Sequence, residues 1–514
     1  QGAQAQAYYA KALRQHGETA LADQCRFGLA RALQLQHKYD DAARFYNYLI
    51  AKEGSPLVDD SLLQLGRLHY QREQYDDALA SLDRLTNDFP NSESAPFAWY
   101  WKGMTQFAKE DFPAATTSLQ RAATAVDPKH SLMPAIQFQL GETFRRSQRL
   151  DDAAAHYQLV IDEAPNSPWA DDAKHGLIRL ASDTGQHAAA EKRATAFLVE
   201  HASSPLAYDV RRLLGRSQHK SQQYDAAIET LSKLVAELDR VAAAPINEGD
   251  SSLSRRDAQQ LAGSARYTLG LAYVGAGKFA EAETAIASLS PNEETEPELA
   301  AGVSAVRAAA LMGQQQYAEA ITPLQNYLRL SPTGPDANQS RAQLAVALAH
   351  TNQLPEAQRV YDELSKTYSD KNEFLTTTNF LADAAFRAGE KAWARELFTA
   401  LADENNPPEF REKGLSGKAW CELDLQSPVR SAQTFDRLLK EFPESTLISQ
   451  AALARASALE KANDPDGAMA MYTLITNKHA QSKEFPLALY QAGKLADTLK
   501  QHQQAEALLL RYIN

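Results

Sequence analysis

The sequence repeats one short motif, first seen as Tyr39-Asp40-Asp41-Ala42, along its whole length. The motif returns as Tyr75-Asp76-Asp77-Ala78, Leu150-Asp151-Asp152-Ala153, Tyr224-Asp225-Ala226-Ala227, Phe279-Ala280-Glu281-Ala282, Tyr317-Ala318-Glu319-Ala320 and Leu354-Pro355-Glu356-Ala357. Its last, small residue falls at positions 42, 78, 115, 153, 190, 227, 282, 320, 357, 394, 431, 468 and 505. All of these steps but one are within a residue of 37, which indicates thirteen copies of one structural unit.

Each copy carries two further apolar positions at fixed distances from this small residue. Twelve residues before it there is a second glycine or alanine in every copy except the fifth, which has Ile178. Four residues after it most copies have a larger apolar residue, such as Tyr46, Leu82 or Tyr157. A spacing of four places side chains on one face of a helix. We therefore predict two helices per copy that approach closely at the small residues and enclose the larger ones.

Turn and charge signals separate the predicted helices. In segments 89–92, 164–167 and 442–445, Pro is followed by Asn-Ser or Glu-Ser, and we expect Pro to end one helix and Asn or Ser to cap the next. Acidic residues such as Asp40, Asp76 and Asp151 occupy the first turn of the second helix, where they complement the positive end of the helix dipole. Much of the net charge of −12 therefore has a structural cause.

This pattern resembles the tetratricopeptide repeat family. The seventh copy is the closest match, with Leu269-Gly270, Tyr273, Gly277, Phe279 and Ala282, and the third copy has the family's early tryptophan at Trp99. The resemblance covers nearly the whole chain. It implies an all-α, right-handed α-solenoid of about thirteen helix pairs after a leading half repeat, but no particular function, because this fold serves many partners.

The repeat is about three residues longer than the commonest repeat of this family, which has about 34. In this it is similar to bacterial cell-envelope members, among them the periplasmic coordinator of the Tol–Pal system and the outer-membrane assembly lipoproteins. The resemblance implies a non-catalytic scaffold of the periplasm or cell envelope that binds a protein or peptide in its concave groove. Alternatives are a periplasmic section of an exopolysaccharide or outer-membrane export machine, the regulatory repeats of a larger enzyme, and a cytoplasmic location.

One step between copies is 55 residues long and marks the predicted domain boundary. Its extra residues surround Pro245, Gly249 and Asp250, in a segment without apolar periodicity. We predict an N-terminal array at 1–243 with the half repeat and repeats 1–6, a linker at 244–253, and a C-terminal array at 254–514 with repeats 7–13. The helices beside the linker are expected to lengthen, to about 226–243 and 254–275. Because the pattern begins and ends in mid-repeat, we expect further repeats or domains beyond both ends.

Motifs for catalysis, cofactors or metals do not emerge. Residues 274–279 hint at a phosphate loop, but Lys278 is not followed by Ser or Thr, so Gly277 is interpreted as a turn glycine. Cys25 and Cys421 are interpreted as buried apolar fillers. We predict no enzyme activity, no cofactor and no metal site. The negative net charge argues against nucleic-acid binding, and no apolar run approaches the ~20 residues of a membrane span.

Two sets of residues occupy positions that face the groove in this family, and together they predict a site for a protein or peptide, possibly acidic, with a few large side chains. The aromatic set comprises Phe27, Tyr70, Phe97, Tyr100, Met104, Phe107 and Phe138. The basic set comprises Arg145, Arg146, Arg179, Arg212, Arg216, His219 and Lys220. The arginines are expected to form one wall of like charge along successive repeats, which an acidic partner would neutralise.

Both sets also have a structural interpretation. Aromatic residues at helical spacing often pack between repeats, and basic residues on a helix face are often solvated or paired with acids. Repeats 8 and 9 offer an alternative surface of small residues that would accept a partner helix. Its members are Ala305, Ala309, Ala342, Val346 and Ala349.

Overall fold

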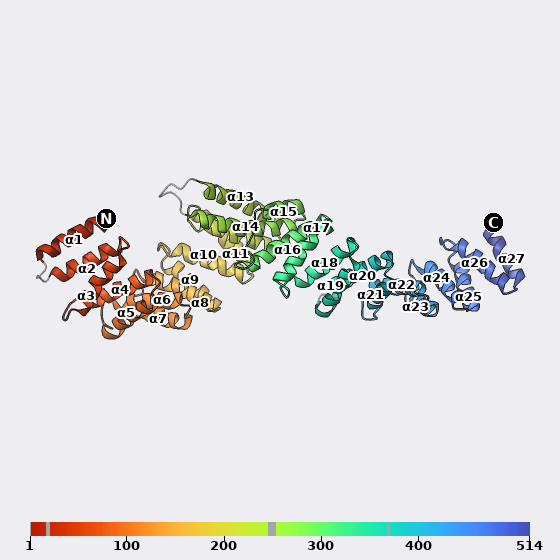
Figure 1. Ribbon diagram of the computed structural model, residues 1–514, viewed down its shortest axis with the longest axis horizontal. Coiled ribbons are helices and arrows are strands. Elements are labelled where there is room, and N and C mark those ends of the chain that lie inside the picture. Colours follow the sequence, from red (N-terminus) through yellow and green to blue (C-terminus); the bar gives the residue numbers. More distant parts are fainter. Residues whose placement is uncertain (1, 17–20, 245–252, 369–370) are drawn as a thin grey trace. The chain divides into compact units, whose positions relative to one another are not determined.

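The computed structural model describes all residues except 1, 17–20, 245–252 and 369–370. Every regular element in these described residues is an α-helix, and there are 27 of them. Helix α1 is followed in the sequence by thirteen successive helix pairs, and most helices pack against the helix before or after them (Figure 1). We number the pairs as repeats 1–13, beginning with α2 and α3. The predicted all-α array of thirteen pairs after a half repeat is confirmed.

The chain forms two compact units, of which the first is Gln1–Gly275. Most of its helices have 13 to 15 residues, a length of about four turns. Its helices are α1 (Gly2–His16), α2 (Leu21–Gln34), α3 (Tyr39–Ala51), α4 (Val58–Gln71), α5 (Tyr75–Asp88), α6 (Ala95–Ala108), α7 (Phe112–Thr124), α8 (Met133–Arg146), α9 (Leu150–Glu163), α10 (Ala170–Asp183), α11 (His187–Glu200), α12 (Ala207–Lys220), α13 (Tyr224–Ala243) and α14 (Arg255–Gly275).

The second unit is Ala276–Asn514. In it, α15 packs against α16, and most of the helices that follow pack against the next helix in the sequence, whereas α20 packs against α18 and α21. Its helices are α15 (Phe279–Ile286), α16 (Pro297–Gly313), α17 (Tyr317–Leu330), α18 (Ala337–His350), α19 (Leu354–Thr367), α20 (Lys371–Ala388), α21 (Lys391–Leu401), α22 (Pro408–Asp424), α23 (Pro428–Glu441), α24 (Ile448–Lys461), α25 (Pro465–Lys478), α26 (Phe485–Thr498) and α27 (His502–Ile513).

The helices beside the anomalous step are longer than the others, as predicted. Helix α13 has 20 residues and α14 has 21, against 14 in a typical first helix such as α12. Helix α14 packs against both α12 and α13 within the first unit. Residues 245–252 lie outside the described residues, so the linker at 244–253 and the two arrays that it separates stay a prediction.

The spacing of small and large residues is explained by close contact between the two helices of a repeat. A Cβ atom on Gly66 would lie 2.7 Å from Leu82 Cγ, and one on Gly141 would lie 2.6 Å from the Tyr157 ring. Leu82 and Tyr157 are fully buried. The large residue of the second helix therefore fills the space that a side chain on the first helix would need, as the sixteen-residue offset predicts.

The turn within every repeat contains one residue with positive φ. In ten repeats this residue is not glycine and has φ between 57° and 63°; the other three have Gly185, Gly277 and Gly389. A single left-handed residue after a helix redirects the chain and lets the next helix begin two residues later. The φ of +71° at Gly277 confirms that this glycine belongs to a repeat turn.

We expect Gly277→Ala to destabilise the region around this turn by about 1 kcal/mol, because a β-carbon disfavours positive φ. Gly277→Asn is the matched control, since Asn tolerates this conformation and occupies the same turn position at Asn352 and Asn463. Hydrogen exchange of α15 (279–286) in the whole chain would measure the effect. Equal protection in the Ala and Asn variants would contradict it.

The turns between repeats hold neighbouring repeats together, and the capping prediction is wrong for them. Ser94 is the N-cap residue of α6, but its side chain makes no capping hydrogen bond. Instead Ser94 Oγ donates to Asp60 Oδ1 at 2.6 Å, and Ser92 Oγ donates to Asp59 Oδ2 at 2.5 Å. Both acids belong to α4 of the preceding repeat. The hydroxyls therefore link neighbouring repeats. Ser92 Oγ also accepts a hydrogen bond from the Ser94 N–H at 3.0 Å, which closes the turn before α6 and does not cap the helix.

Candidate functional site

The predicted site residues lie on the first helices of repeats 1–6. First helices of neighbouring repeats contact one another directly, for example α8 with α10 and α10 with α12. We call the solvent-facing sides of α2, α4, α6, α8, α10 and α12 the first-helix face. Tyr100 is only 7% exposed, whereas the other aromatic residues of the predicted set and Met104 are half-buried.

The aromatic residues form several small ring groups and not one cluster, and Tyr70 and Tyr100 share a group because both contact Trp101. Most of the pairs join neighbouring helices or repeats, with ring centroids 5.3 to 5.8 Å apart. The pairs are Phe27 with Tyr46, Tyr70 with Trp101, Phe97 with His130, Phe107 with Phe112, and Phe138 with Trp169. Part of each ring thus packs the array, and only the remaining surface is open to a partner.

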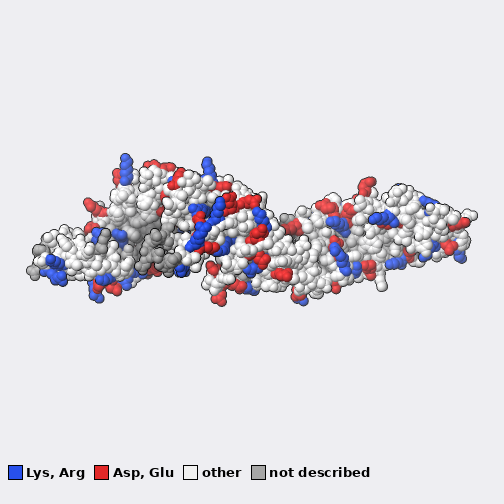
Figure 2. Space-filling model, turned by 90° about the horizontal axis from the view of Figure 1, so that it is seen from above, with Lys and Arg blue, Asp and Glu red and all other residues white. Residues whose placement is uncertain are grey.

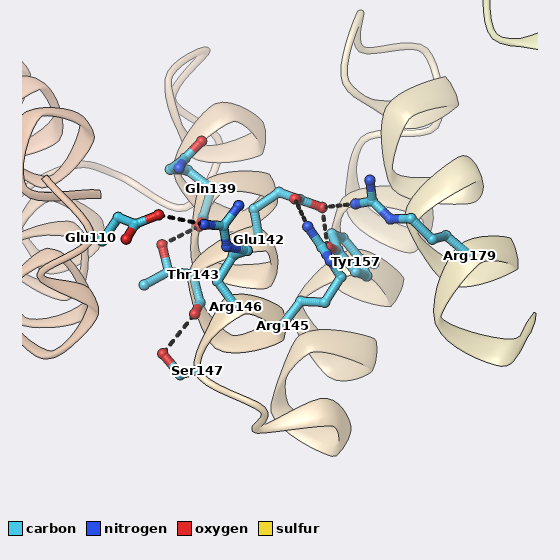
Figure 3. Close-up of polar contacts among 9 residues, drawn as sticks. All are labelled: Glu110, Gln139, Glu142, Thr143, Arg145, Arg146, Ser147, Tyr157 and Arg179. Carbon is cyan, nitrogen blue, oxygen red and sulfur yellow. Dashed lines mark hydrogen bonds and ion pairs between the residues drawn. The ribbon is translucent and has the colours of Figure 1, made fainter. Parts of the chain in front are cut away.

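The basic residues of repeats 4 and 5 converge on one carboxylate, Glu142 (Figure 3). Arg145 Nη2 lies 2.9 Å from Glu142 Oε2, and Arg179 Nη2 donates to Glu142 Oε1. The Tyr157 hydroxyl donates to the same Oε1 atom. These groups come from α8, α9 and α10, so the carboxylate links two repeats. The side chain of Glu142 is only 14% exposed.

This arrangement keeps Glu142 ionised. Burial alone would raise the pKa of the carboxyl group, but the hydrogen bond from Arg145, the charge of Arg179 and the Tyr157 hydroxyl outweigh it and lower the pKa below its usual value of 4.5. Burial, together with the neighbouring Glu142 carboxylate, raises the pKa of Tyr157, which therefore stays a donor. The Nε atoms of Arg145 and Arg179 are buried and have no hydrogen-bond partner in the described residues.

A second carboxylate, that of Asp209, links repeats 5 and 6. Asp209 Oδ1 accepts from Arg212 Nε at 2.7 Å, and Asp209 Oδ2 lies 2.6 Å from His175 Nε2. Burial opposes ionisation of Asp209, but these bonds and the charge of Arg212 lower its pKa well below the usual value. Arg216 pairs with Asp183 at 2.9 Å, and Arg146 pairs with Glu110 at the same distance.

The predicted wall of like charge is therefore wrong as a description of these arginines. Arg145, Arg146, Arg179, Arg212 and Arg216 each have a carboxylate partner. Figure 2 shows basic and acidic side chains next to one another on the face that it presents, not in separate fields. The sequence analysis missed Glu142 and Asp209, although both stand at first-helix positions close to the arginines. The pairs Glu142–Arg145 and Asp209–Arg212 lie three residues apart on one helix and could have been predicted from the sequence. The pair of Glu142 with Arg179 joins two repeats and depends on how the repeats stack.

Sequence reasoning also missed two other arginines at a shared register position. The residue directly after the small residue of the first helix is Arg31 in repeat 1 and Arg67 in repeat 2. In the described residues, neither forms an ion pair with a carboxylate. Arg67 instead stacks on the Trp101 ring, with its Cζ atom 5.0 Å from the ring centroid. The register was the available signal, because the same position holds Arg179 and Arg216 in repeats 5 and 6.

Other sequence expectations concern the rest of the described chain. Among the residues of repeats 8 and 9 predicted as an alternative surface, Ala342 is buried and Ala305, Ala309, Val346 and Ala349 are half-buried. Cys421 is buried, as predicted, but Cys25 is only half-buried. In the described part of the chain, no group of three His, Cys, Asp or Glu side chains is arranged to hold a metal ion. No helix in that part is both long and apolar enough to cross a membrane.

The helix pairs, their small-to-large contacts and their left-handed turn residues define a tetratricopeptide-repeat solenoid. A family profile described as tetratricopeptide repeat matches residues 175–245, 305–371 and 379–446. Tetratricopeptide repeats thus occur in both units, as the resemblance in the sequence implies.

The N-terminal repeats have a more particular relationship. Residues 31–190 match a family profile, YfiO, described as outer membrane lipoprotein. The chain is 22% identical over 217 residues to the outer membrane protein assembly factor BamD of Pasteurella multocida, covering 39% of this chain and 76% of that protein. It is 23% identical over 203 residues to BamD of Xylella fastidiosa, covering 37% of this chain and 62% of that protein. The resemblance to outer-membrane assembly lipoproteins is thus confirmed.

Two solved structures resemble this chain at low sequence identity. A tetratricopeptide repeat protein from Parabacteroides merdae is 14% identical, and the match covers 56% of this chain and 98% of that one, with a TM-score of 0.39. The Cut9–Hcn1 hetero-tetramer is 13% identical, and the match covers 98% of this chain and 92% of that one, with a TM-score of 0.32. Both superpositions are too loose to support an argument about function.

Proposed function

We propose that this chain is a non-catalytic scaffold of the bacterial cell envelope that takes part in assembling outer-membrane proteins. It holds a protein or peptide partner on its first-helix face, in the periplasm. The observation that carries the proposal is an overlap: residues 31–190, which match the outer membrane lipoprotein profile, include most of the half-buried aromatic residues and arginines of that face. Repeat solenoids offer extended surfaces of this kind for binding.

The proposed contact residues divide by chemistry. The apolar ones supply area that is only partly used by packing between repeats, and the arginines keep free N–H donors beyond those that their carboxylates occupy. We therefore propose that the arginines orient a polar partner backbone and do not neutralise a strongly acidic one. The contact residues are Tyr70, Phe97, Tyr100, Met104, Phe107, Phe138, Arg145, Arg146, Arg179, Arg212 and Arg216.

Site-specific photo-crosslinking in the native host tests the proposal. We expect a photoreactive side chain at Phe107, on the first-helix face, to capture outer-membrane proteins or their assembly machinery. The matched control is Leu159, which is 42% exposed on the second helix α9 of repeat 4. Mass spectrometry would identify the products. Equal capture from both positions, or capture of export-machine components only, would contradict the proposal.

A further inference from the structure

The first helices of repeats 11–13, in the second unit, enclose a groove whose chemistry differs from that of repeats 1–6. Its volume is about 480 Å³, which is in the range of binding sites in proteins. It is lined mainly by α22, α24 and α26, and we call it the C-terminal groove. No arginine is among the described residues that line it. The groove therefore offers a partner apolar and acidic side chains instead of guanidinium groups.

Apolar side chains from three successive first helices form the wall of the C-terminal groove. Trp420 of α22 and Leu453 of α24 are half-buried, and Leu487 of α26 is 47% exposed. The Trp420 ring is held in place by an edge-to-face contact with Phe435, with ring centroids 5.6 Å apart. Each of the three wall residues thus keeps apolar surface that packing within the array does not use, and a partner side chain would bury it.

Two carboxylates line the same groove without a cation to pair with. In the part of the chain that the structure describes, neither Glu460 nor Glu484 forms an ion pair. Glu484 is the N-cap residue of α26, but its side chain makes no capping hydrogen bond. Lys483 also lines the groove and is likewise unpaired among the described residues. Two carboxylates and one ammonium group leave the groove with a net negative charge.

A comparison of repeat 12 with repeat 1 indicates that the fold does not require the charge of Glu460. The buried Tyr472 hydroxyl donates to Glu460 Oε1 at 2.8 Å. In repeat 1 the buried Tyr46 hydroxyl donates to Gln34 Oε1 at 3.1 Å. Glu460 and Gln34 occupy the same register position, four residues after the small residue of the first helix. A neutral amide is thus enough to hold the tyrosine, and the carboxylate in repeat 12 adds a charge and a second oxygen that remain for another donor.

We propose that the C-terminal groove binds a partner polypeptide at a lysine or arginine side chain that stands beside a bulky apolar residue. The cation pairs with Glu460 and Glu484. The apolar residue packs against Trp420 and Leu487. The inference goes beyond the proposed function, because α22, α24 and α26 lie outside residues 31–190, which match the outer membrane lipoprotein profile. It gives the chain a second binding site, which disfavours acidic segments and anionic lipid headgroups.

Fluorescence anisotropy with the whole chain tests this inference. The probe is a labelled twelve-residue glycine–serine peptide with Phe-Lys-Leu at its centre, and its control has Phe-Gln-Leu there. We expect the Lys peptide to bind about tenfold more tightly, as one hydrogen bond to a charged group would give. The double variant Glu460→Gln/Glu484→Gln should abolish this difference. It should melt at the temperature of the parent, because glutamine at position 460 still accepts the Tyr472 hydroxyl, as Gln34 accepts that of Tyr46.

Two further variants separate the apolar contact from net charge. Leu487→Ser should weaken both peptides by roughly fivefold and keep the preference for lysine, because it removes apolar surface and no charge. Asp466→Asn/Glu506→Gln is the matched control, since it removes two negative charges from exposed positions on the second helices α25 and α27. It should bind both peptides as the parent does.

Three outcomes would overturn the inference. The first is equal binding of the Lys and Gln peptides to the parent, and the second is an equal loss of the preference in the Asp466→Asn/Glu506→Gln variant. The third is an effect of Leu487→Ser on self-association, measured by light scattering, or on binding to phosphatidylglycerol vesicles, while neither peptide binds. That result would assign the groove to a second copy of the chain or to a membrane surface.

Discussion

Replacing Gly414 with alanine should destabilise the second unit by about 3 kcal/mol or more, which lies at the upper end for added atoms in a packed interior. Its Cβ atom would lie 2.7 Å from the Leu401 carbonyl carbon and 2.8 Å from Phe398 O, and it would also meet Ala402 N. All three are backbone atoms at the end of α21, so no side-chain rotation can relieve the contact. Helix propensity alone would favour alanine by about 1 kcal/mol, so a net loss must come from this contact.

The end of α21 is held in place by its own hydrogen bonds. The buried Asn406 side chain donates to Ala400 O at 2.8 Å and to Leu401 O at 3.1 Å. Lys413→Ala is the matched control, because Lys413 is the exposed neighbour on the same helix. Thermal melting and hydrogen exchange of α21 and α22 would measure the change. Because repeat arrays contact mainly their neighbours, hydrogen exchange of the helices in the first unit should be unchanged. A melting temperature equal to that of the Lys413 variant would contradict the contact argument.

Replacing Glu142 with glutamine should destabilise repeats 4 and 5 by about 3 kcal/mol, the usual cost of removing one member of a buried ion pair. The variant leaves Arg145 and Arg179, whose side chains are 22% and 28% exposed, without their shared carboxylate. Glu110→Gln is the matched control, because Glu110 is 70% exposed and its pair with Arg146 lies at the surface. Such a surface ion pair contributes about 1 kcal/mol or less to the free energy of unfolding. Hydrogen exchange of α8 and α10 would separate the two cases.

The effect of Glu142 also depends on pH, and its sign follows from the lowered pKa. A carboxyl group with a lower pKa in the folded state stabilises that state above its unfolded pKa, here 4.5. This stabilisation is lost as the pH falls through the folded pKa, which lies below 4.5. The difference in the free energy of unfolding between the parent and Glu142→Gln should therefore be largest at pH 7 and should decrease at pH values below about 4.5. If this difference in stability stays constant down to pH 3, the charge of Glu142 is not the cause of the destabilisation.

The register of small and large residues could be predicted because it repeats within each copy. Gly66 with Leu82 and Gly141 with Tyr157 are local pairs, sixteen residues apart, and their spacing alone requires two closely packed helices. The greater length of α13 and α14 was predicted from the one 55-residue step between copies. The capping prediction failed at Ser92 because α6 begins only after Ser94, and the Ser92 hydroxyl donates to Asp59 of the preceding repeat, 33 residues away in the chain.

The candidate site was predictable in position but not in charge balance. The register placed Arg145, Arg179 and Arg212 on the first helices, where the structure has them. The neighbours Glu142 and Asp209 stand three residues before Arg145 and Arg212 and were overlooked. The register could not show that Glu142 also pairs with Arg179 of the next repeat, or that Arg31 and Arg67 have no carboxylate partner in the described residues.

The sequence by itself determined the class of fold, the number of repeats and the residues that each helix presents, because these depend on contacts within one repeat of about 37 residues. Only the tertiary structure decided which charges on the first-helix face are already satisfied. Ion pairing between repeats depends on how the side chains of consecutive first helices meet in space, and a periodic sequence places these residues in register without fixing which of them come within hydrogen-bonding distance.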